Sequence, residues 1–136
     1  MFKYIKTINA HCAAPEISEY TLDGQHDVKA GSVMFHNNYG LSPAFLDPTQ
    51  SDRKYFVIED FTYDEKKPVK VKAVPITPGM IFETETNIED IEVGLCYLLT
   101  SSFDGNSFDT ISNATGHGAR IFKVLGGKRY WVELDW

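Results

Sequence analysis

The sequence predicts an all-β fold: a small antiparallel β-barrel or β-sandwich with an irregular N-terminal arm and long loops. Three observations lead to this prediction. Short runs rich in β-branched and aromatic residues alternate apolar with polar side chains, as strands with one buried face do. Gly, Pro, Asn and Asp separate these runs at turn positions. Helical periodicity of more than about two turns is absent, and residues 88–91 are expected to form one turn at most.

The first 25 residues are predicted to be an N-terminal arm or irregular segment, and residues 26–136 a single β domain. Residues 9–25 show little regular alternation. Residues 37–52 contain two prolines, two asparagines and a glycine. Such composition predicts long ordered connections, or arms that pack against something else.

The predicted β domain uses one turn pattern twice. Residues 28–35 and 91–98 share the order apolar, charged, small, glycine and then a strand-like run. Glycine adopts positive φ and permits close backbone approach without steric penalty. We therefore expect turns at Gly31 and Gly94, each of which opens the next strand.

Residues 54–59 and 69–74 are predicted to be the two strands of a hairpin around a polar stretch. In the second strand, apolar side chains at alternate positions are separated by two lysines, which predicts a sheet with one buried and one wet face. Pro75 and Pro78 lack the amide hydrogen that a strand ladder needs. The chain is therefore expected to leave the strand there or to run along an edge.

Five further strands are predicted in the C-terminal part of the chain. They are residues 80–85, 95–99, 108–111, 119–124 and 129–134. The Asp-Gly-Asn sequence at 104–106 and the glycine pair at 126–127 suit hairpin turns with positive φ. In the last strand Tyr130 shares a face with Val132 and Leu134, whereas Trp131 faces the other way. Such a strand lies centrally in a sandwich, or a partner covers its outer face.

Length, charge and cysteine content narrow the class of protein. A chain of 136 residues fits one domain that needs neither a disulfide framework nor a structural metal. Cys12 and Cys96 have no C-x-x-C or zinc-finger spacing; Cys96 is expected to be a small buried side chain, and a Cys12–Cys96 disulfide stays open. The formal net charge of −6 argues against a protein that grips nucleic-acid phosphates. No signal peptide or membrane span is recognisable, so we expect a soluble protein made in a cytoplasm.

No catalytic or metal-binding set is recognisable. His117 lies in a glycine-flanked loop, but no Ser, Cys or carboxylate stands at a spacing typical of nucleophilic catalysis, so we interpret it as a surface residue. The acidic residues at 83–92 and the segment 104–109 do not follow the ligand order of a calcium loop, and alternation places Glu83 and Glu85 on a solvated face. Nucleotide-binding, zinc-protease and hydrolase motifs are absent. We expect no catalytic residue, no cofactor and no metal.

The chain is rich in aromatic residues: seven Tyr, nine Phe and two Trp. The charges between them are mostly acidic, which favours core filling and protein–protein anchoring over a single-stranded nucleic-acid platform. With the strands placed, residues 26–134 resemble the small all-β capsid decoration (cement, or head auxiliary) proteins of tailed bacteriophages. The likeness is carried by residues 28–33, 71–83, 91–95 and the closing glycine hairpin into residues 130–134.

This resemblance implies a non-enzymatic virion structural protein. Such a protein is made in the host cytoplasm, binds the capsid exterior and stabilises contacts between major capsid subunits. The implied partners are the major capsid protein and copies of the protein itself, with no nucleic acid and no membrane. No catalytic residues carry over, because the family has none.

Six residues are expected at an interface with partner chains. Residues 1–8 are predicted to lie along a neighbouring subunit as an added strand, the two-faced final hairpin to be covered, and the last residue to act as an anchor. The six are Phe2, Tyr4, Ile5, Tyr130, Trp131 and Trp136.

Three alternatives remain open. A phage tail or neck structural protein would use the same kind of β domain in a ring. A carbohydrate- or small-ligand-binding β module would expose Trp and Tyr on one sheet face. An enzyme is the least supported, because the four histidines at 11, 26, 36 and 117 are scattered through loops instead of clustering with carboxylates on strands.

Overall fold

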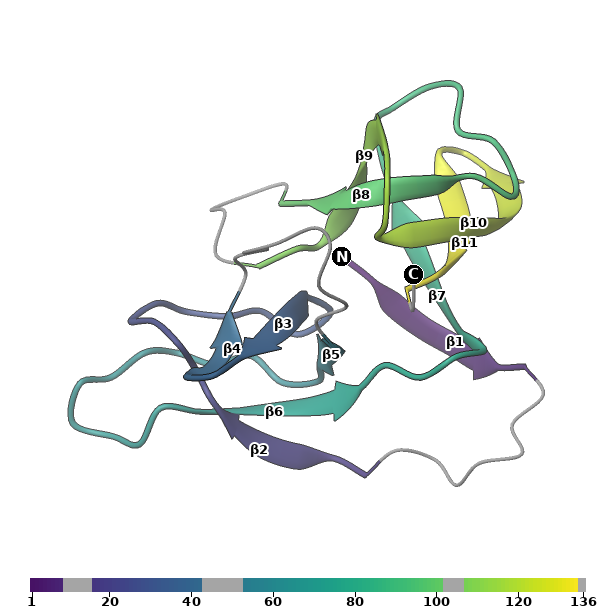
Figure 1. Cartoon of the computed structure of the whole chain (residues 1–136). Coiled ribbons are helices and arrows are strands. Elements are labelled where there is room, and N and C mark those ends of the chain that lie inside the picture. Colours follow the sequence, from purple (N-terminus) through teal and green to yellow (C-terminus); the bar gives the residue numbers. More distant parts are fainter. Residues whose placement is uncertain (9–15, 43–52, 102–106, 135–136) are drawn as a thin grey trace.

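The computed structural model describes residues 1–8, 16–42, 53–101 and 107–134. It is all-β, with two antiparallel sheets of six and five strands and no helix among these residues (Figure 1). The arrangement is consistent with a β-sandwich and confirms the predicted fold class.

The six-stranded sheet has the order β1-β7-β11-β10-β8-β9, and every neighbouring pair is antiparallel. The sheet curls so that its last strand, β9, comes back to β7. The Thr110 hydroxyl of β9 donates a 2.7 Å hydrogen bond to the backbone carbonyl of Glu85 in β7. Its strands are β1 (Lys3–Thr7), β7 (Met80–Glu85), β11 (Arg129–Glu133), β10 (Ala119–Gly126), β8 (Cys96–Thr100) and β9 (Thr110–Thr115).

The five-stranded sheet has the order β2-β6-β5-β3-β4, again antiparallel throughout. Its two edges meet, since Leu22 forms a parallel bridge with Leu41 and the Asp23 amide donates to the Leu41 carbonyl at 2.8 Å. Its strands are β2 (Ser18–Thr21), β6 (Lys70–Pro75), β5 (Lys54–Val57), β3 (Val33–Asn37) and β4 (Gly40–Ser42).

The repeated glycine turn is confirmed. Gly31 and Gly94 have φ of +86° and +88°, and β3 and β8 each begin two residues later. The glycine pair at 126–127 also has positive φ and joins β10 to β11, as predicted. The predicted turn at 104–106 lies outside the described residues, although the strands on either side of it, β8 and β9, are paired.

The predicted hairpin of β5 and β6 is confirmed as an antiparallel pair. Val71 and Ala73 are fully buried while Lys70 and Lys72 are exposed, so the predicted alternation is correct. Pro75 ends β6, as its missing amide hydrogen requires.

One strand begins later than expected. Residues 108–111 were expected to pair as a strand, but β9 starts at Thr110. Phe108 instead forms a two-way bridge with Val33 of the other sheet, through backbone hydrogen bonds of 2.7 and 3.1 Å. This bridge joins the two sheets directly.

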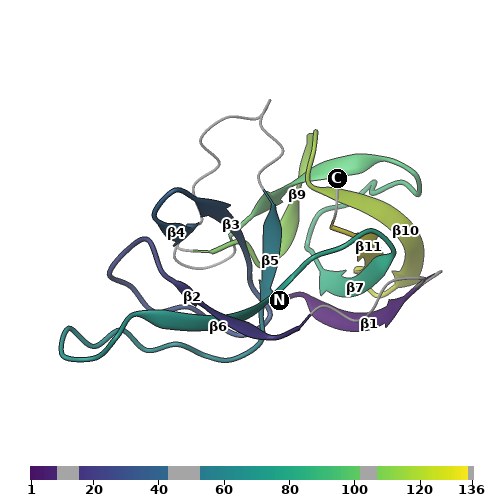
Figure 2. The same cartoon turned by 60° about the horizontal axis from the view of Figure 1, so that its bottom comes forward.

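The first 25 residues add an edge strand to each sheet (Figure 1, Figure 2). β1 pairs with β7, and β2 pairs with β6. The expected irregularity of residues 9–25 is therefore wrong at residues 18–21. This strand, Ser-Glu-Tyr-Thr, carries a single apolar side chain, so its pairing with β6 could not be read from alternation. Residues 9–15 lie outside the described residues.

Buried apolar side chains form two clusters. The first core cluster lies between the sheets: the six-stranded sheet supplies most of it, and Val33 and Phe56 enter from the five-stranded sheet. The second core cluster, which includes Met34, Tyr55 and Val57, lies on the other face of the five-stranded sheet. β3 and β5 are therefore buried on both faces, whereas one face of β6 stays exposed at Lys70 and Lys72.

Candidate interaction surface

Exposed apolar side chains gather at one corner of the six-stranded sheet. Val93, Leu95, Phe122 and Val124, hereafter the apolar corner, are 40–60 % exposed. The Gly94 amide donates to the Ile121 carbonyl, and the Ile121 amide to the Leu95 carbonyl, each at 2.9 Å, so these two segments lie side by side. An exposed apolar area of this kind is typical of a surface that binds another protein.

A bulge positions Phe122. The register between β10 and β11 shifts between Ile121 and Lys123, which leaves Phe122 without a partner in the ladder. A bulge re-aims the extra side chain and bends the strand. The bulge therefore explains why a large aromatic residue in a strand interior is exposed.

Trp131 lies on the outer face of the same sheet, surrounded by charge. The Nζ atoms of Lys6 and Lys123 lie 5.2 and 5.1 Å from its ring, and its Nε1–H donates to Glu83 Oε1 at 3.3 Å. Trp131 is half-buried. We call Lys6, Glu83, Lys123 and Trp131 the Trp131 cluster. β11 is central in its sheet, and the chain's own lysines flank the indole on the outer face.

Two of the six predicted interface residues are core residues. Phe2 is 2 % exposed and Tyr130 is 7 % exposed, and both belong to the first core cluster. The Phe2 amide also donates to the Gly31 carbonyl at 2.9 Å. Neither side chain is accessible to a partner in this conformation, because the protein's own core already buries both.

The other predicted interface residues differ in exposure. Tyr4 is 44 % exposed, and its hydroxyl hydrogen-bonds the Thr7 hydroxyl at 2.8 Å. Ile5 is half-buried at the bulge of β1, Trp131 is half-buried, and Trp136 lies outside the described residues. The strand expected to add to a neighbouring subunit adds to β7 of its own sheet.

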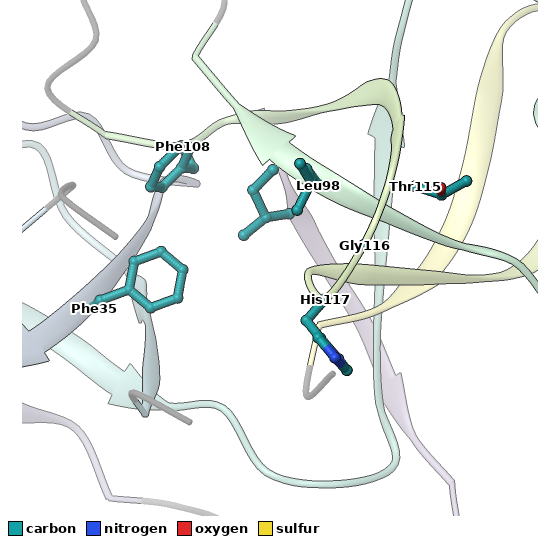
Figure 3. Close-up of a pocket in the computed structure, with 7 residues that line it drawn as sticks. Phe35, Leu98, Phe108, Thr115, Gly116 and His117 are labelled. Atoms are coloured by element: carbon teal, nitrogen blue, oxygen red, sulfur yellow. The ribbon is translucent and has the colours of Figure 1, made fainter. Parts of the chain in front are cut away.

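A cavity of about 490 Å³ opens beside β8 and β9. The rings of Phe35 and Phe108 meet edge to face at 5.6 Å on one side of it, and the exposed His117 lies on the other (Figure 3). No local sequence pattern marks this cavity, because its walls come from both sheets. Its lining residues are Phe35, Leu98, Leu99, Phe108, Thr115, Gly116 and His117.

The described residues contain no cluster of metal-ligating side chains. Across residues 1–8, 16–42, 53–101 and 107–134, no group of three or more His, Cys, Asp or Glu side chains is placed to hold a metal. Cys96 is half-buried, and its possible disulfide partner Cys12 lies outside the described residues.

Among the described residues, Tyr55 has a pKa that its surroundings shift. Burial raises the pKa of Tyr55 above 10.0, the neighbouring Tyr20 adds to the rise, and Arg53 opposes it. The two tyrosine rings lie 4.7 Å apart, and His36 lies 5.8 Å from Tyr55. Because Tyr55 packs in the second core cluster, this aromatic group is a structural element.

Comparisons of the chain with protein-family models, with curated proteins and with solved structures found no match. The described part of the chain contains no helix long and apolar enough to cross a bilayer. Three features remain as candidate sites: the apolar corner, the Trp131 cluster and the cavity beside His117.

Proposed function

We propose that this protein is a non-enzymatic virion structural protein that binds the outer surface of a viral capsid and stabilises contacts between major capsid subunits. The observation that carries this proposal is the apolar corner, where four large side chains stay 40–60 % exposed on a hydrogen-bonded sheet. The resemblance to capsid decoration proteins supplies the kind of partner.

Burial of the apolar corner would supply binding energy. Complete burial of a large apolar side chain contributes about 1.5–3 kcal/mol, and aromatic residues are the preferred anchors of interfaces. Phe122 is the aromatic residue of the corner and is held out by the bulge of β10. We therefore expect Phe122 to occupy the centre of the contact with the capsid.

The charge of the chain fits an external position. A net charge of −6 repels packaged nucleic acid and favours a location outside the shell. A tail or neck location would use the same β domain, and the particle itself distinguishes the two.

The test is to purify intact particles from infected cells and to combine mass spectrometry with image reconstruction. We expect the chain in the particles, with density on the outer shell and the end of β10 facing a capsid subunit. Absence from intact particles, density in the tail or neck, or density inside the shell would each contradict the capsid assignment.

The cavity favours a second candidate, a small-ligand-binding β module. Pockets of a few hundred Å³ with apolar walls and few polar groups are typical of ligand sites, and this cavity is of that kind. A ligand-observed NMR screen with apolar fragments and glycans would test it. Binding should be lost in Leu98→Asp, which places a charge among the apolar walls of the cavity (Figure 3), and kept in Asn113→Asp, which lies outside its lining. Absence of binding, or equal binding to both variants, would exclude this function.

A further inference from the structure

We infer that the Trp131 cluster is a docking site for an acidic segment of a protein partner. This inference rests on the proposed protein-binding function and names the chemistry of the partner at one part of the surface. Three observations carry it: the convergence of two lysines on one indole ring, the charge of the surrounding face, and continuity with the apolar corner.

The two lysines converge from separate strands. Lys6 is on β1 and Lys123 is on β10, with β7 and β11 between them, yet both Nζ atoms lie within 5.2 Å of the centre of the Trp131 ring. The hydrogen bond from Nε1 to Glu83 orients the indole across the sheet. The site is therefore assembled by tertiary structure around one oriented aromatic ring.

Both ammonium groups remain available to an anion. In the described part of the chain neither Lys6 nor Lys123 makes an ion pair, whereas Lys72 pairs with Glu59 at 3.3 Å. A cation over a ring that water still reaches gains little, so the indole leaves both ammonium groups able to bind an anion. A carboxylate placed between these lysines would interact with two positive charges. Both interactions become stronger when the bound partner excludes water from the surface.

The sheet face around Trp131 carries more basic than acidic residues, although the whole protein is acidic. Register and alternation place five basic and three acidic residues on this face of β1, β7, β11 and β10, a surplus of two positive charges, whereas the whole chain has 13 basic and 19 acidic residues. Complementary charge therefore favours an acidic partner. The eight are Lys3, Lys6, Arg120, Lys123, Arg129, Glu83, Glu85 and Glu133.

The Trp131 cluster adjoins the apolar corner at Phe122. At the bulge of β10 two residues, Phe122 and Lys123, oppose Trp131 alone, so an apolar anchor lies beside the paired lysines. An apolar centre beside charged groups is the usual anatomy of a protein interface. We therefore favour a protein segment with carboxylates next to apolar side chains over a nucleic-acid phosphate, which would also meet the chain's overall negative charge.

The first experiment needs no natural partner. Hexaglutamate is titrated into the full chain, and the indole N–H signal of Trp131 is followed by NMR at low salt. We expect a saturable shift in the wild type and in the control variant Lys66→Gln/Lys67→Gln, whose lysines are exposed in a turn of the other sheet region. The shift should disappear in Lys6→Gln/Lys123→Gln.

Three outcomes would overturn the inference. One is the absence of any Trp131 shift at millimolar peptide. Another is an equal shift in the Lys6→Gln/Lys123→Gln variant. The third is tighter binding of an oligonucleotide of the same charge, which would assign the site to phosphates.

The second experiment separates this inference from the proposed function. Affinity for the particle is compared for the same two double variants; Lys6→Gln/Lys123→Gln should bind about tenfold more weakly, and the control within about twofold of the wild type. If the peptide binds at Trp131 but no particle binds the wild type, the proposed function fails and the inference stands. If the particle binds the wild type and both variants alike, the inference fails and the proposed function stands.

Discussion

The two sheets of this protein differ in what covers them. In the five-stranded sheet the chain itself covers both faces of β3 and β5: one face packs in the first core cluster, and the other forms the second, where Val28 and Phe61 close over it through paired backbone hydrogen bonds of 2.9 and 2.8 Å. The six-stranded sheet buries one face, and its other face is open around β10, with Trp131 half-buried and Phe122 exposed, although Ile81 of β7 is buried on that face.

This difference indicates where a partner binds. No strand of the five-stranded sheet carries a large apolar side chain that is exposed, within the described ranges, whereas β1, β8 and β10 of the other sheet do. The apolar content of the five-stranded sheet is thus explained by the protein's own core. We assign the exposed apolar side chains of the six-stranded sheet to a surface that a partner covers.

The largest expected effect comes from removing the side chain that joins the two halves. Phe82 is fully buried, and its ring centre lies 5.0 Å from that of Phe56 in the other sheet. Phe82→Ala should lower the free energy of unfolding by about 3–5 kcal/mol, because it leaves a cavity between the sheets. Chemical denaturation measures this, with Phe122→Ala as the exposed control, expected within about 0.5 kcal/mol of wild type. Similar losses in both variants would contradict the contrast between covered and open faces.

Closure of the five-stranded sheet depends on Gly40. Its φ is +138°, and an added Cβ would collide with the Thr21 carbonyl where the two sheet edges meet. Gly40→Ala should therefore cost about 2 kcal/mol or more in the free energy of unfolding. Gly94→Ala is the matched control, with φ of +88° and open space around it, and should cost only about 1–2 kcal/mol. Equal costs would show that the edge contact contributes nothing.

Binding to the particle should depend on exposed side chains of the open sheet face, and not on exposed aromatic side chains elsewhere. Phe122→Asp should weaken binding to the particle at least about tenfold, since it places a charge in an apolar contact. Tyr39→Asp is the control: Tyr39 is 78 % exposed on the turn between β3 and β4, in the other half of the molecule. Both variants should unfold at nearly the wild-type denaturant concentration. Equal weakening by the two would move the interface away from the apolar corner.

The smallest expected effect concerns pH and the second core cluster. Burial raises the pKa of Tyr55 above the value of 10.0 that an unfolded chain has. The folded state therefore holds this proton more tightly, and stability should fall once the pH rises past about 10, where the unfolded chain releases the proton first. Tyr55→Phe should show a shallower alkaline loss in denaturation curves at pH 9 to 11, roughly. An identical loss would mean that this face is less well covered than the structure indicates.

Local patterns were enough to predict most strands. β7, β10 and β11 lie where alternation placed them, and the glycines at 31, 94 and 126–127 form the expected turns with positive φ. These features depend on residues that are neighbours in the sequence, so no knowledge of the fold was needed.

The candidate sites were harder to predict. Tyr130 and Trp131 alternate as expected, but alternation does not say that Tyr130 is buried within its own subunit or that two distant lysines flank Trp131. Phe2 was expected at an interface with a partner chain but packs in the first core cluster. Because β1 pairs with β7 of the same chain, the adjoining Phe2 is held against this chain's own core. The cavity beside His117 combines residues of both sheets and has no local signature.

The sequence by itself determined the all-β class, the positions of most strands and the turns between them, since side-chain alternation and glycine φ preferences act over a few residues. Only the tertiary structure decided the order of the strands, the burial of both faces of β3 and β5 and the open face around Trp131. The physical reason is that pairing joins strands far apart in the chain, and which face becomes covered depends on what the rest of the chain packs against it.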